Sequence, residues 1–202
     1  MQGRKRTIAS VDQDLGTRDR LLEAAIALMR RAGLSAAGIN EIVKEGGAPK
    51  GSVYHFFPQG KRQIVSEALA RYSERIVAVF DEALSRKRRP RDKIHALFQA
   101  LVRRLEAGDF RLSCAAGAVS LDLDDDLEVV RLEIAQAFVA WRDLIARHFP
   151  IADRRRRESF AGLVLTAIEG GYIRGRAEHS SQPFKDAATW LGEVAEAEVR
   201  RG

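Results

Sequence analysis

Apolar residues recur every three or four positions along almost the whole chain, and this periodicity limits the possible folds more than any other feature. Between positions 18 and 32 it makes one broad apolar stripe, formed by Leu21, Leu22, Ala25, Ile26, Leu28 and Met29. No segment shows the alternation of apolar and polar residues that is typical of a half-buried strand. The sequence therefore predicts an all-α protein.

The periodic segments and the residues that interrupt them predict about nine helices. Thr17 is a suitable N-cap for the first helix, Gly33 is suited to end it, and Pro90 fits a first helical turn. Helices as short as the second and third are not stable alone in water, so we expect them to pack against the first. The expected ranges are 18–32, 40–45, 49–56, 59–85, 91–106, 125–148, 153–177 and 184–200, with one further short helix within 108–123.

Composition excludes several classes of protein. With 46% hydrophobic and 31% charged residues among 202, the chain can bury a core, which excludes wholesale disorder. Cys114 is the only cysteine, so neither an intramolecular disulfide nor a thiolate zinc site is expected. Because no apolar run is long enough to cross a bilayer and no signal core follows the basic start, we expect no membrane association and a cytoplasmic location.

Most of the net charge of +6 lies in the first third of the chain. Residues 1–62 hold eleven Lys or Arg and six Asp or Glu, whereas the remainder holds 23 basic and 22 acidic residues. This distribution is typical of a chain with one polyanion-binding end, although chance clustering beside a disordered tail gives the same count.

Residues 38–61 carry the strongest functional signal. Two short helices, 40–45 and 49–56, are separated by a Gly-Gly-Ala sequence that permits a tight turn, and this arrangement is typical of a helix-turn-helix. The outer face of the second helix is free of acids and combines hydrogen-bond donors with small residues: Lys50, Gly51, Ser52, Tyr54 and His55. Such a face suits phosphates and base edges in a DNA major groove, whereas ordinary packing of Tyr54 and His55 is the alternative.

At these positions the chain resembles the TetR family of bacterial transcriptional regulators. The resemblance runs from Thr17-Arg18 through Gly33 to the segment Gly47-Ala48-Pro49-Lys50-Gly51-Ser52-Val53-Tyr54-His55-Phe56-Phe57 and Lys61. The sequence Phe57-Pro58-Gln59-Gly60-Lys61 is similar to the LmrA/YxaF-type branch of the family, as are segments 110–116 and 168–171. The resemblance therefore extends over most of the chain.

The resemblance implies DNA-contacting roles for individual residues. The start of the first helix, which touches a phosphate in family members, corresponds to Thr17 and Arg18. The base-reading part of the recognition helix corresponds to Lys50, Gly51 and Ser52, and the phosphate-contacting positions correspond to Tyr54, His55 and Lys61. Two residues depart from the family pattern: Pro49 replaces a common Ser or Thr N-cap, and Phe56 replaces a His or Tyr that often donates to phosphate.

These assignments divide the chain into three parts. Residues 1–16 are expected to form a flexible basic arm, 17–63 the helix-turn-helix DNA-binding domain, and 64–202 a larger helical domain for effector binding and dimerisation. The basic residues of the arm can enter an adjacent minor groove, and an unstructured solubilising tail is the alternative. They are Arg4, Lys5 and Arg6.

The last two long helices, 153–177 and 184–200, combine apolar residues with small ones that permit close helix approach. They are the expected four-helix dimer interface, where the family also dimerises, and packing inside one chain is the alternative. A twofold dimer reads a near-palindromic operator. The interface residues are Phe160, Leu163, Val164, Ala167, Gly171, Ala188, Leu191 and Ala195.

The middle helices carry aromatic and apolar residues in a less regular pattern, which suits a cavity for an apolar or aromatic effector. Plain core packing is the alternative for each of them. The expected lining is Phe98, Leu101, Phe110, Cys114, Val119, Phe138, Trp141 and Tyr172, with Glu169 as a polar contact. Asp122, Asp124, Asp125 and Asp126 are expected to cap the next helix rather than bind a cation, because a helix N-terminus favours negative charge.

The sequence shows no catalytic set. Gly60-Lys61 lacks the spacing of a phosphate loop, the histidines lack metal spacing, and Cys114 has no evident base. We therefore predict no enzyme activity, no metal and no cofactor. The predicted function is that of a homodimeric repressor, released from a double-stranded palindromic operator by a small effector. The alternatives are an all-helical small-molecule-binding protein or enzyme and a non-specific chromosome-associated protein.

Overall fold

The computed structural model describes residues 16–123 and 127–201, and every regular element in these ranges is a helix, as predicted. No helix in these ranges is both long enough and apolar enough to cross a membrane. Arg4, Lys5 and Arg6 lie outside them. The helices are α1 (Thr17–Ala32), α2 (Ile39–Glu45), α3 (Lys50–Phe56), α4 (Lys61–Ser85), α5 (Pro90–Ala107), α6 (Ala115–Ser120), α7 (Glu128–Arg147), α8 (Arg154–Glu178) and α9 (Gln182–Arg200).

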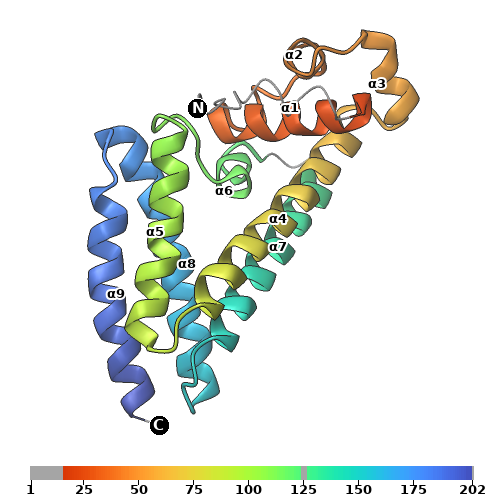
Figure 1. Cartoon of the computed structure of the whole chain (residues 1–202). Coiled ribbons are helices and arrows are strands. Elements are labelled where there is room, and N and C mark those ends of the chain that lie inside the picture. The colour runs from red at the N-terminus through yellow and green to blue at the C-terminus, as the bar shows by residue number, and fades with distance from the viewer. Residues whose placement is uncertain (1–15, 124–126, 202) are drawn as a thin grey trace, which may run out of the picture.

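The helices form two regions. The first three make a headpiece (α1–α3) at one end of the molecule, and the remaining six make a body (α4–α9) (Figure 1). The long helix α4 runs from the headpiece along α7, while α5 packs along α9, and α8 contacts both α7 and α9. The short α6 lies between these two groups and contacts α1, so the headpiece touches the body at α6 as well as α4.

The helix α1 holds the headpiece together. Its inner side includes Leu21, Ala25 and Met29, none of which is exposed. Both short helices pack against α1, and each contributes a fully buried side chain, Ile42 from α2 and Val53 from α3. The expectation that α1 stabilises the short helices is confirmed.

The C-terminal end of α1 agrees with the prediction, whereas the N-terminal end does not. Gly33 ends α1 with φ of 77°, a left-handed conformation that favours glycine. Gly16 is the N-cap residue, however, and Thr17 is already the first helical residue, so the expected Thr17 cap is wrong.

The N-cap residue of α7 is not one of the four aspartates that were predicted to cap this helix. α7 begins at Glu128 rather than near residue 125, and the N-cap residue Leu127 offers no side-chain hydrogen bond. The carboxylate of Asp122 instead accepts a hydrogen bond from the backbone N–H of Ser35 at 3.0 Å. The next three aspartates, 124–126, lie outside the described residues.

The helices α8 and α9 approach each other closely at a glycine. A Cβ atom placed on Gly171 of α8 lies 2.3 Å from Cε1 of Phe184, whose ring is fully buried on α9. A Cβ atom placed on the neighbouring Gly170 has no atom within 4 Å. Only Gly171 is therefore required by the packing of these two helices.

We expect Gly171→Ala to lower the free energy of unfolding by about 1–3 kcal/mol, because the Phe184 ring has to move within a packed core. Gly170→Ala is the matched control, and we expect it to be neutral or to raise stability by up to about 1 kcal/mol, since alanine favours helix. Urea unfolding followed by circular dichroism measures both. Equal effects of the two substitutions would contradict the close α8–α9 contact.

Candidate DNA-binding surface and ligand pocket

The helix α3 places the predicted base-reading residues on one outer surface. Val53 anchors the helix in the core, and no residue of α3 is acidic. Pro49 is its N-cap residue and, as expected, supplies no capping hydrogen bond. The outer residues are Lys50, Gly51, Tyr54 and His55, which are exposed, and Ser52, which is half-buried. A donor-rich face without carboxylates suits contact with a polyanion.

The turn before α3 depends on its two glycines. Gly47 has φ of 58°, and a Cβ atom on Gly46 lies 3.2 Å from the carbonyl oxygen of Arg20 in α1. Nε of Arg20 in turn donates to the carbonyl oxygen of Gly46 at 3.2 Å. The turn is therefore fixed against α1, which sets the direction of α3.

Three further predicted DNA-contacting residues already have protein partners. The hydroxyl of Thr17 accepts a hydrogen bond from Arg20 at 3.3 Å. Arg18 forms an ion pair with Glu67 and lies 5.1 Å from the centre of the Phe57 ring. Nζ of Lys61 donates to the carbonyl oxygen of Leu34 at 3.1 Å. The contacts of Arg18 and Lys61 join the headpiece to α4, and the phosphate contacts of these side chains stay a prediction.

Arginines of α4 neutralise two acidic residues of α1. Arg71 pairs with both Asp19 and Glu23, and Nη1 of Arg75 donates to Glu23 at 2.6 Å. Partial burial raises the pKa of Glu23, but the two guanidinium groups outweigh it, so this pKa lies below its usual value. These ion pairs therefore neutralise two of the six acidic residues of positions 1–62 and use none of the basic residues counted there.

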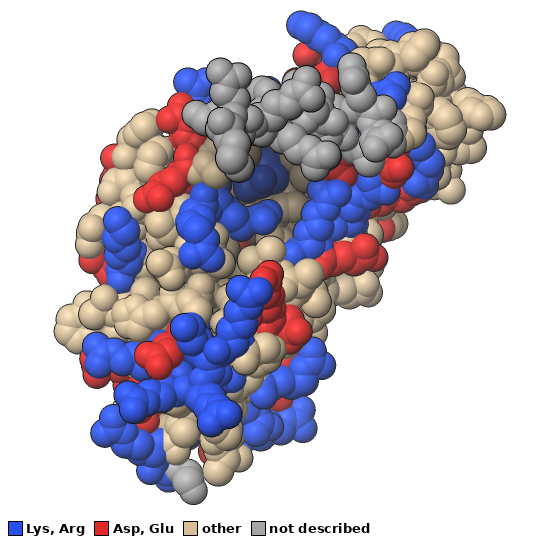
Figure 2. Space-filling view, viewed as in Figure 1, with Lys and Arg blue, Asp and Glu red and all other residues tan. Residues whose placement is uncertain are grey.

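Basic side chains also gather at the end of the molecule away from the headpiece (Figure 2). Several of them form ion pairs with acidic neighbours: Arg154 with Glu158 at 2.7 Å, and Arg156 with Glu198 at 2.6 Å. Exposed pairs of this kind contribute little stability and keep the surface solvated. The arrangement agrees with a solvated surface rather than a second DNA contact.

Hydrogen bonds fix the last turn of α1 to the body. The backbone N–H of Ser113 donates to the carbonyl oxygen of Arg30 at 2.8 Å, and Nε of Arg30 donates back to the carbonyl oxygen of Ser113 at 3.0 Å. Nη2 of Arg176 in α8 donates to the carbonyl oxygen of Arg31 at 2.9 Å. Two separate segments of the body thus bind adjacent residues of α1.

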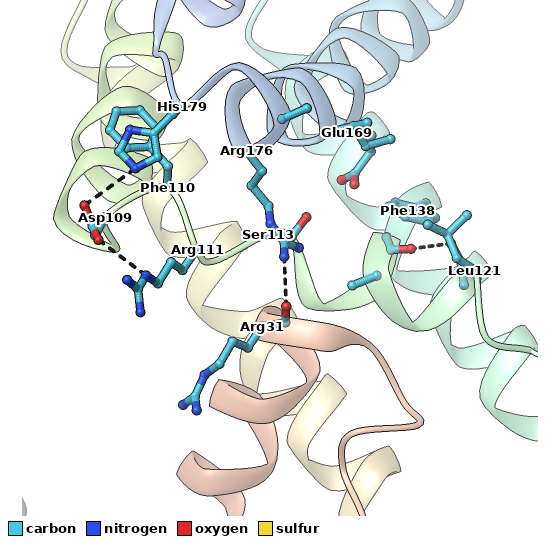
Figure 3. A pocket seen from close by; sticks show the side chains of 15 residues that line it. Arg31, Asp109, Phe110, Arg111, Ser113, Leu121, Phe138, Glu169, Arg176 and His179 are labelled. Atoms are coloured by element: carbon cyan, nitrogen blue, oxygen red, sulfur yellow. Dashed lines mark hydrogen bonds and ion pairs between the residues drawn. The ribbon is translucent and has the colours of Figure 1, made fainter.

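A cavity of about 950 Å³ lies next to these hydrogen bonds. Arg176 crosses it toward Arg31, with Phe110 and His179 on one side and Glu169 on the other (Figure 3). The loop at one wall is held in an uncommon conformation, since Asp109 and Phe110 both have positive φ. The lining residues are Arg31, Asp109, Phe110, Arg111, Ser113, Gly117, Ala118, Ser120, Leu121, Phe138, Glu169, Ile173, Arg176, Ala177 and His179.

Three of the nine predicted ligand-contacting residues line this cavity, namely Phe110, Phe138 and Glu169. The other six are buried: Phe98, Leu101, Cys114, Val119, Trp141 and Tyr172. Trp141, whose Nε1 donates to the hydroxyl of Ser73 at 2.9 Å, lines a separate cavity of about 360 Å³ between α4 and α7. The sequence pattern did not indicate the three arginines of the larger cavity, Arg31, Arg111 and Arg176, because only aromatic and apolar residues and Glu169 were expected to line it.

Glu169 has the most perturbed environment of the cavity lining. Burial raises its pKa to about 7, and the neighbouring Cys114 thiol partly offsets this rise. Its Oε2 atom lies so close to Gly117 that a Cβ atom there comes within 2.1 Å of it. Glycine at position 117 therefore makes room for the Glu169 side chain.

The residues assigned to the dimer interface mostly face inward. Six of the eight are buried within one chain, Ala167 is half-buried, and Leu163 alone is exposed, at 51%. The six are Phe160, Val164, Gly171, Ala188, Leu191 and Ala195. The outer surface of α8 and α9 carries different apolar residues, Trp190 with 73% and Val194 with 38% of the side chain exposed. Leu163 and Val194 line one shallow groove between the two helices.

Comparison with known proteins agrees with this arrangement. Residues 21–68 match the family model described as bacterial regulatory proteins of the tetR family, and residues 90–189 match the LmrA/YxaF-like transcriptional regulator C-terminal domain. An uncharacterised HTH-type transcriptional regulator of Mycobacterium tuberculosis is 31% identical over 177 residues, covering 84% of this chain and 89% of the relative. The chain belongs to the TetR family.

Other members of the TetR family show how far the similarity extends. The HTH-type transcriptional regulator LmrA of Bacillus subtilis is 27% identical, over 83% of this chain and 90% of LmrA. The regulatory protein TetR from Rhodobacter sphaeroides has the same fold, with a TM-score of 0.78 and 21% identity over 88% of this chain and 97% of that one. CifR, solved with 26-base-pair operator DNA, has a TM-score of 0.71 and 19% identity, covering 91% and 95%.

Membership of the TetR family confirms the predicted helix-turn-helix, the LmrA/YxaF-type resemblance and the role of a DNA-binding transcriptional regulator. The individual DNA-contacting, pocket and interface residues stay predictions, as does the lack of catalytic activity. In residues 16–123 and 127–201, no group of three or more His, Cys, Asp or Glu is placed to hold a metal ion.

The raised pKa of Glu169 predicts how stability depends on pH. Because this pKa lies above its usual value of 4.5, the folded protein holds the proton more tightly than the unfolded chain. The contribution of Glu169 to the free energy of unfolding is therefore complete at pH values below its pKa in the unfolded chain. This contribution is lost as the pH rises toward its pKa in the folded protein. We expect Glu169→Gln to remove this fall and gain up to about 3 kcal/mol relative to the parent between about pH 5 and about pH 8.

Urea unfolding at several pH values measures this effect, with Glu74→Gln on the exposed side of α4 as the control. The ionisable groups around Glu169 are Cys114 and Tyr172, whose own pKa values are raised by burial, Tyr172 to about 12. Neither titrates in the range used. A pH profile of Glu169→Gln parallel to that of the parent would show that Glu169 is ionised in the folded protein throughout.

Proposed function

We propose that this TetR-family regulator is a homodimeric repressor, which a small effector with an apolar or aromatic body releases from a near-palindromic operator. The observation that carries the proposal is the direct attachment of the headpiece to the wall of a ligand-sized cavity. Arg31 is part of α1 and also lines the cavity, where Arg176 binds its carbonyl oxygen. A ligand in the cavity therefore touches the helix that positions α3.

DNA binding in this proposal uses the exposed face of α3. Lys50 lies in the first turn, where recognition helices contact base edges, and Tyr54 and His55 lie one turn further along. The exposed fraction of Tyr54 is 56%, so its hydroxyl can reach a phosphate without moving the helix. A cytoplasmic location, where bacterial DNA lies, stays the corresponding prediction.

Dimerisation in this proposal uses the outer surface of α8 and α9. Large apolar side chains that are exposed close together are typical of an interface; Leu163 and Val194 line one groove, and the exposed Trp190 lies one helical turn before Val194 on α9, so we take these three as the patch. A twofold axis through this patch makes an isologous four-helix contact, with the two α3 helices about 34 Å apart or slightly more to fit successive major grooves. The inward-facing residues named from the sequence then support this surface from below.

Release in this proposal follows from competition at the end of α1. An effector that separates Arg176 from Arg31, or Ser113 from Arg30, changes the position of α1 relative to the body. The two headpieces of a dimer then lose the spacing that the operator requires. A coupling of about 1–3 kcal/mol between the two ligands is typical of such systems.

The DNA-binding surface is tested by Lys50→Ala, which we expect to reduce the preference for the operator over unrelated duplex by about 1–3 kcal/mol, because base contacts carry the sequence preference. Lys185→Ala is the control, because it removes the same charge from an exposed position on α9, outside the headpiece. Gel shifts against DNA upstream of neighbouring genes, at several salt concentrations, measure both. Absence of any salt-sensitive, sequence-preferring binding by the parent protein would contradict the proposal.

The dimer surface is tested by Leu163→Glu, which we expect to convert the dimer to a monomer and abolish operator binding, because a carboxylate is poorly tolerated at the centre of an apolar contact. Leu132→Glu is the matched control, since Leu132 is 46% exposed on α7, outside the patch. Analytical ultracentrifugation measures the mass of each variant. A dimer that survives Leu163→Glu places the interface elsewhere.

A further inference from the structure

Four helices and the residue that precedes α6 bring polar side chains together in the interior of the protein. We name this group the buried polar cluster: Arg30 of α1, Tyr72 of α4, Arg104 of α5, Cys114 before α6, and Glu169 and Tyr172 of α8. Its members act on one another electrostatically, since burial and the neighbouring Cys114 and Tyr172 raise the pKa of Tyr72 while Arg30 and Arg104 oppose the rise. The guanidinium of Arg30 also lies 5.8 Å from the centre of the Tyr72 ring.

The buried polar cluster has unused hydrogen-bonding capacity. Tyr72 and Tyr172 are 2% and 1% exposed, and neither hydroxyl forms a hydrogen bond of normal geometry with a described residue, although Tyr72 lies close enough to the Cys114 thiol to oppose the rise that burial causes in the pKa of that thiol. Three further buried atoms lack partners in the same sense: Nη2 of Arg30, Nε of Arg104 and Oε1 of Glu169. Buried polar atoms in folded proteins are almost always paired, so five such atoms in one place point to a binding function.

The chemistry of the buried polar cluster favours an anion. Four of the five unpaired atoms can donate, and two of them belong to guanidinium groups, which stay protonated. Within the described residues neither Arg30 nor Arg104 forms an ion pair; Nε of Arg30 donates only to the carbonyl oxygen of Ser113. Arg30 and Arg104, both half-buried, bring two positive charges to the cluster, and Glu169 brings one carboxyl group, so positive charge is in excess and a carboxylate from outside balances it.

The cluster adjoins the 950 Å³ cavity already described. Glu169 belongs to both, and Ser113, which lines the cavity, is bonded to Arg30. The cavity itself supplies apolar surface, from Phe110, Leu121 and Phe138. The cavity, with its apolar lining, is thus next to the buried polar cluster, which carries the two guanidinium groups.

We propose that the effector is an amphipathic carboxylate, whose apolar body occupies the cavity and whose carboxylate binds in the buried polar cluster, between Arg30, Arg104 and the two tyrosine hydroxyls. This inference rests on the proposed function, in which the cavity receives the effector. It extends that function by naming the charged group that the effector carries and the residues that bind it.

The position of Arg30 gives this ligand class a direct effect on the headpiece. The unpaired atoms of the cluster are closed to solvent, so an entering carboxylate has to draw the Arg30 guanidinium away from the face of Tyr72. That movement disturbs the bond from Nε of Arg30 to Ser113, one of the bonds that fix α1 to the body. A neutral ligand of the same shape fills the cavity without this pull on Arg30.

The experiment compares two carboxylates with their neutral amides: decanoate with decanamide, and 2-naphthoate with 2-naphthamide. Binding to the full-length protein is measured by calorimetry without DNA. At least one carboxylate is expected to bind about tenfold more tightly than its amide, or better, because hydrogen bonds to a charged group are the stronger ones. Arg104→Met and Tyr172→Phe are expected to reduce this preference while amide binding is retained. Arg103→Met, an exposed neighbour on α5, is the matched control.

Three outcomes overturn the inference: both amides bind as tightly as the carboxylates, none of the four probes binds, or Arg103→Met lowers the preference as much as Arg104→Met. If Arg104→Met does not fold, Tyr172→Phe, which removes a single hydroxyl, serves as the test. The inference then fails if Tyr172→Phe leaves the preference for carboxylate over amide unchanged. Operator binding is measured separately on the unliganded parent protein. If operator binding is absent while the carboxylate preference persists, the proposed repressor function fails and the ligand class stands; the reverse result rejects the ligand class alone.

Discussion

The position of the DNA-reading helix depends on α1, because α2 and α3 have only seven residues each and do not form stable helices alone. α1 constrains α3 both through the buried Val53 and through the turn at Gly46, and α2, which also contacts α3, is itself packed against α1. The last turn of the same helix is bonded to α8 and to the loop before α6. The same helix, α1, thus positions α3 and also lines the cavity, so a shift of α1 at the cavity changes the position of α3.

The helices and the helix-turn-helix were predictable from the sequence because both depend on local patterns. Apolar residues at helical spacing and a glycine such as Gly33 act within a few residues of one another, whatever the rest of the chain does. The orientation of α8 was not predictable in this way. Its sequence is apolar on more than one side, and only the packing of Phe184 against Gly171 decides that Leu163 faces outward. Small residues indicated a close contact correctly, but the contact lies inside one chain.

The lining of the cavity could not be predicted from the sequence for a second reason. Aromatic residues were assigned to the lining, yet side chains such as Trp141 and Phe98 fill the core, because large apolar groups are the most effective at excluding water from it. Arg176, which lines the cavity, binds the backbone carbonyl of a distant segment, at Arg31, 145 positions away. A carbonyl oxygen is present at every residue, so no residue type marks such a contact in the sequence.

A buried cluster of unpaired donors reduces stability, since each unsatisfied polar group costs about 1–3 kcal/mol and apolar side chains of similar size would pack without that loss. The cluster at Tyr72 and Tyr172 thus weakens the interior at the place where α1 joins the body. A ligand that satisfies these atoms recovers the lost free energy only in the conformation that admits it. Coupling between two ligands is reciprocal, so DNA that holds α1 in its present position must weaken binding at Arg30 by the same factor by which the ligand weakens DNA binding.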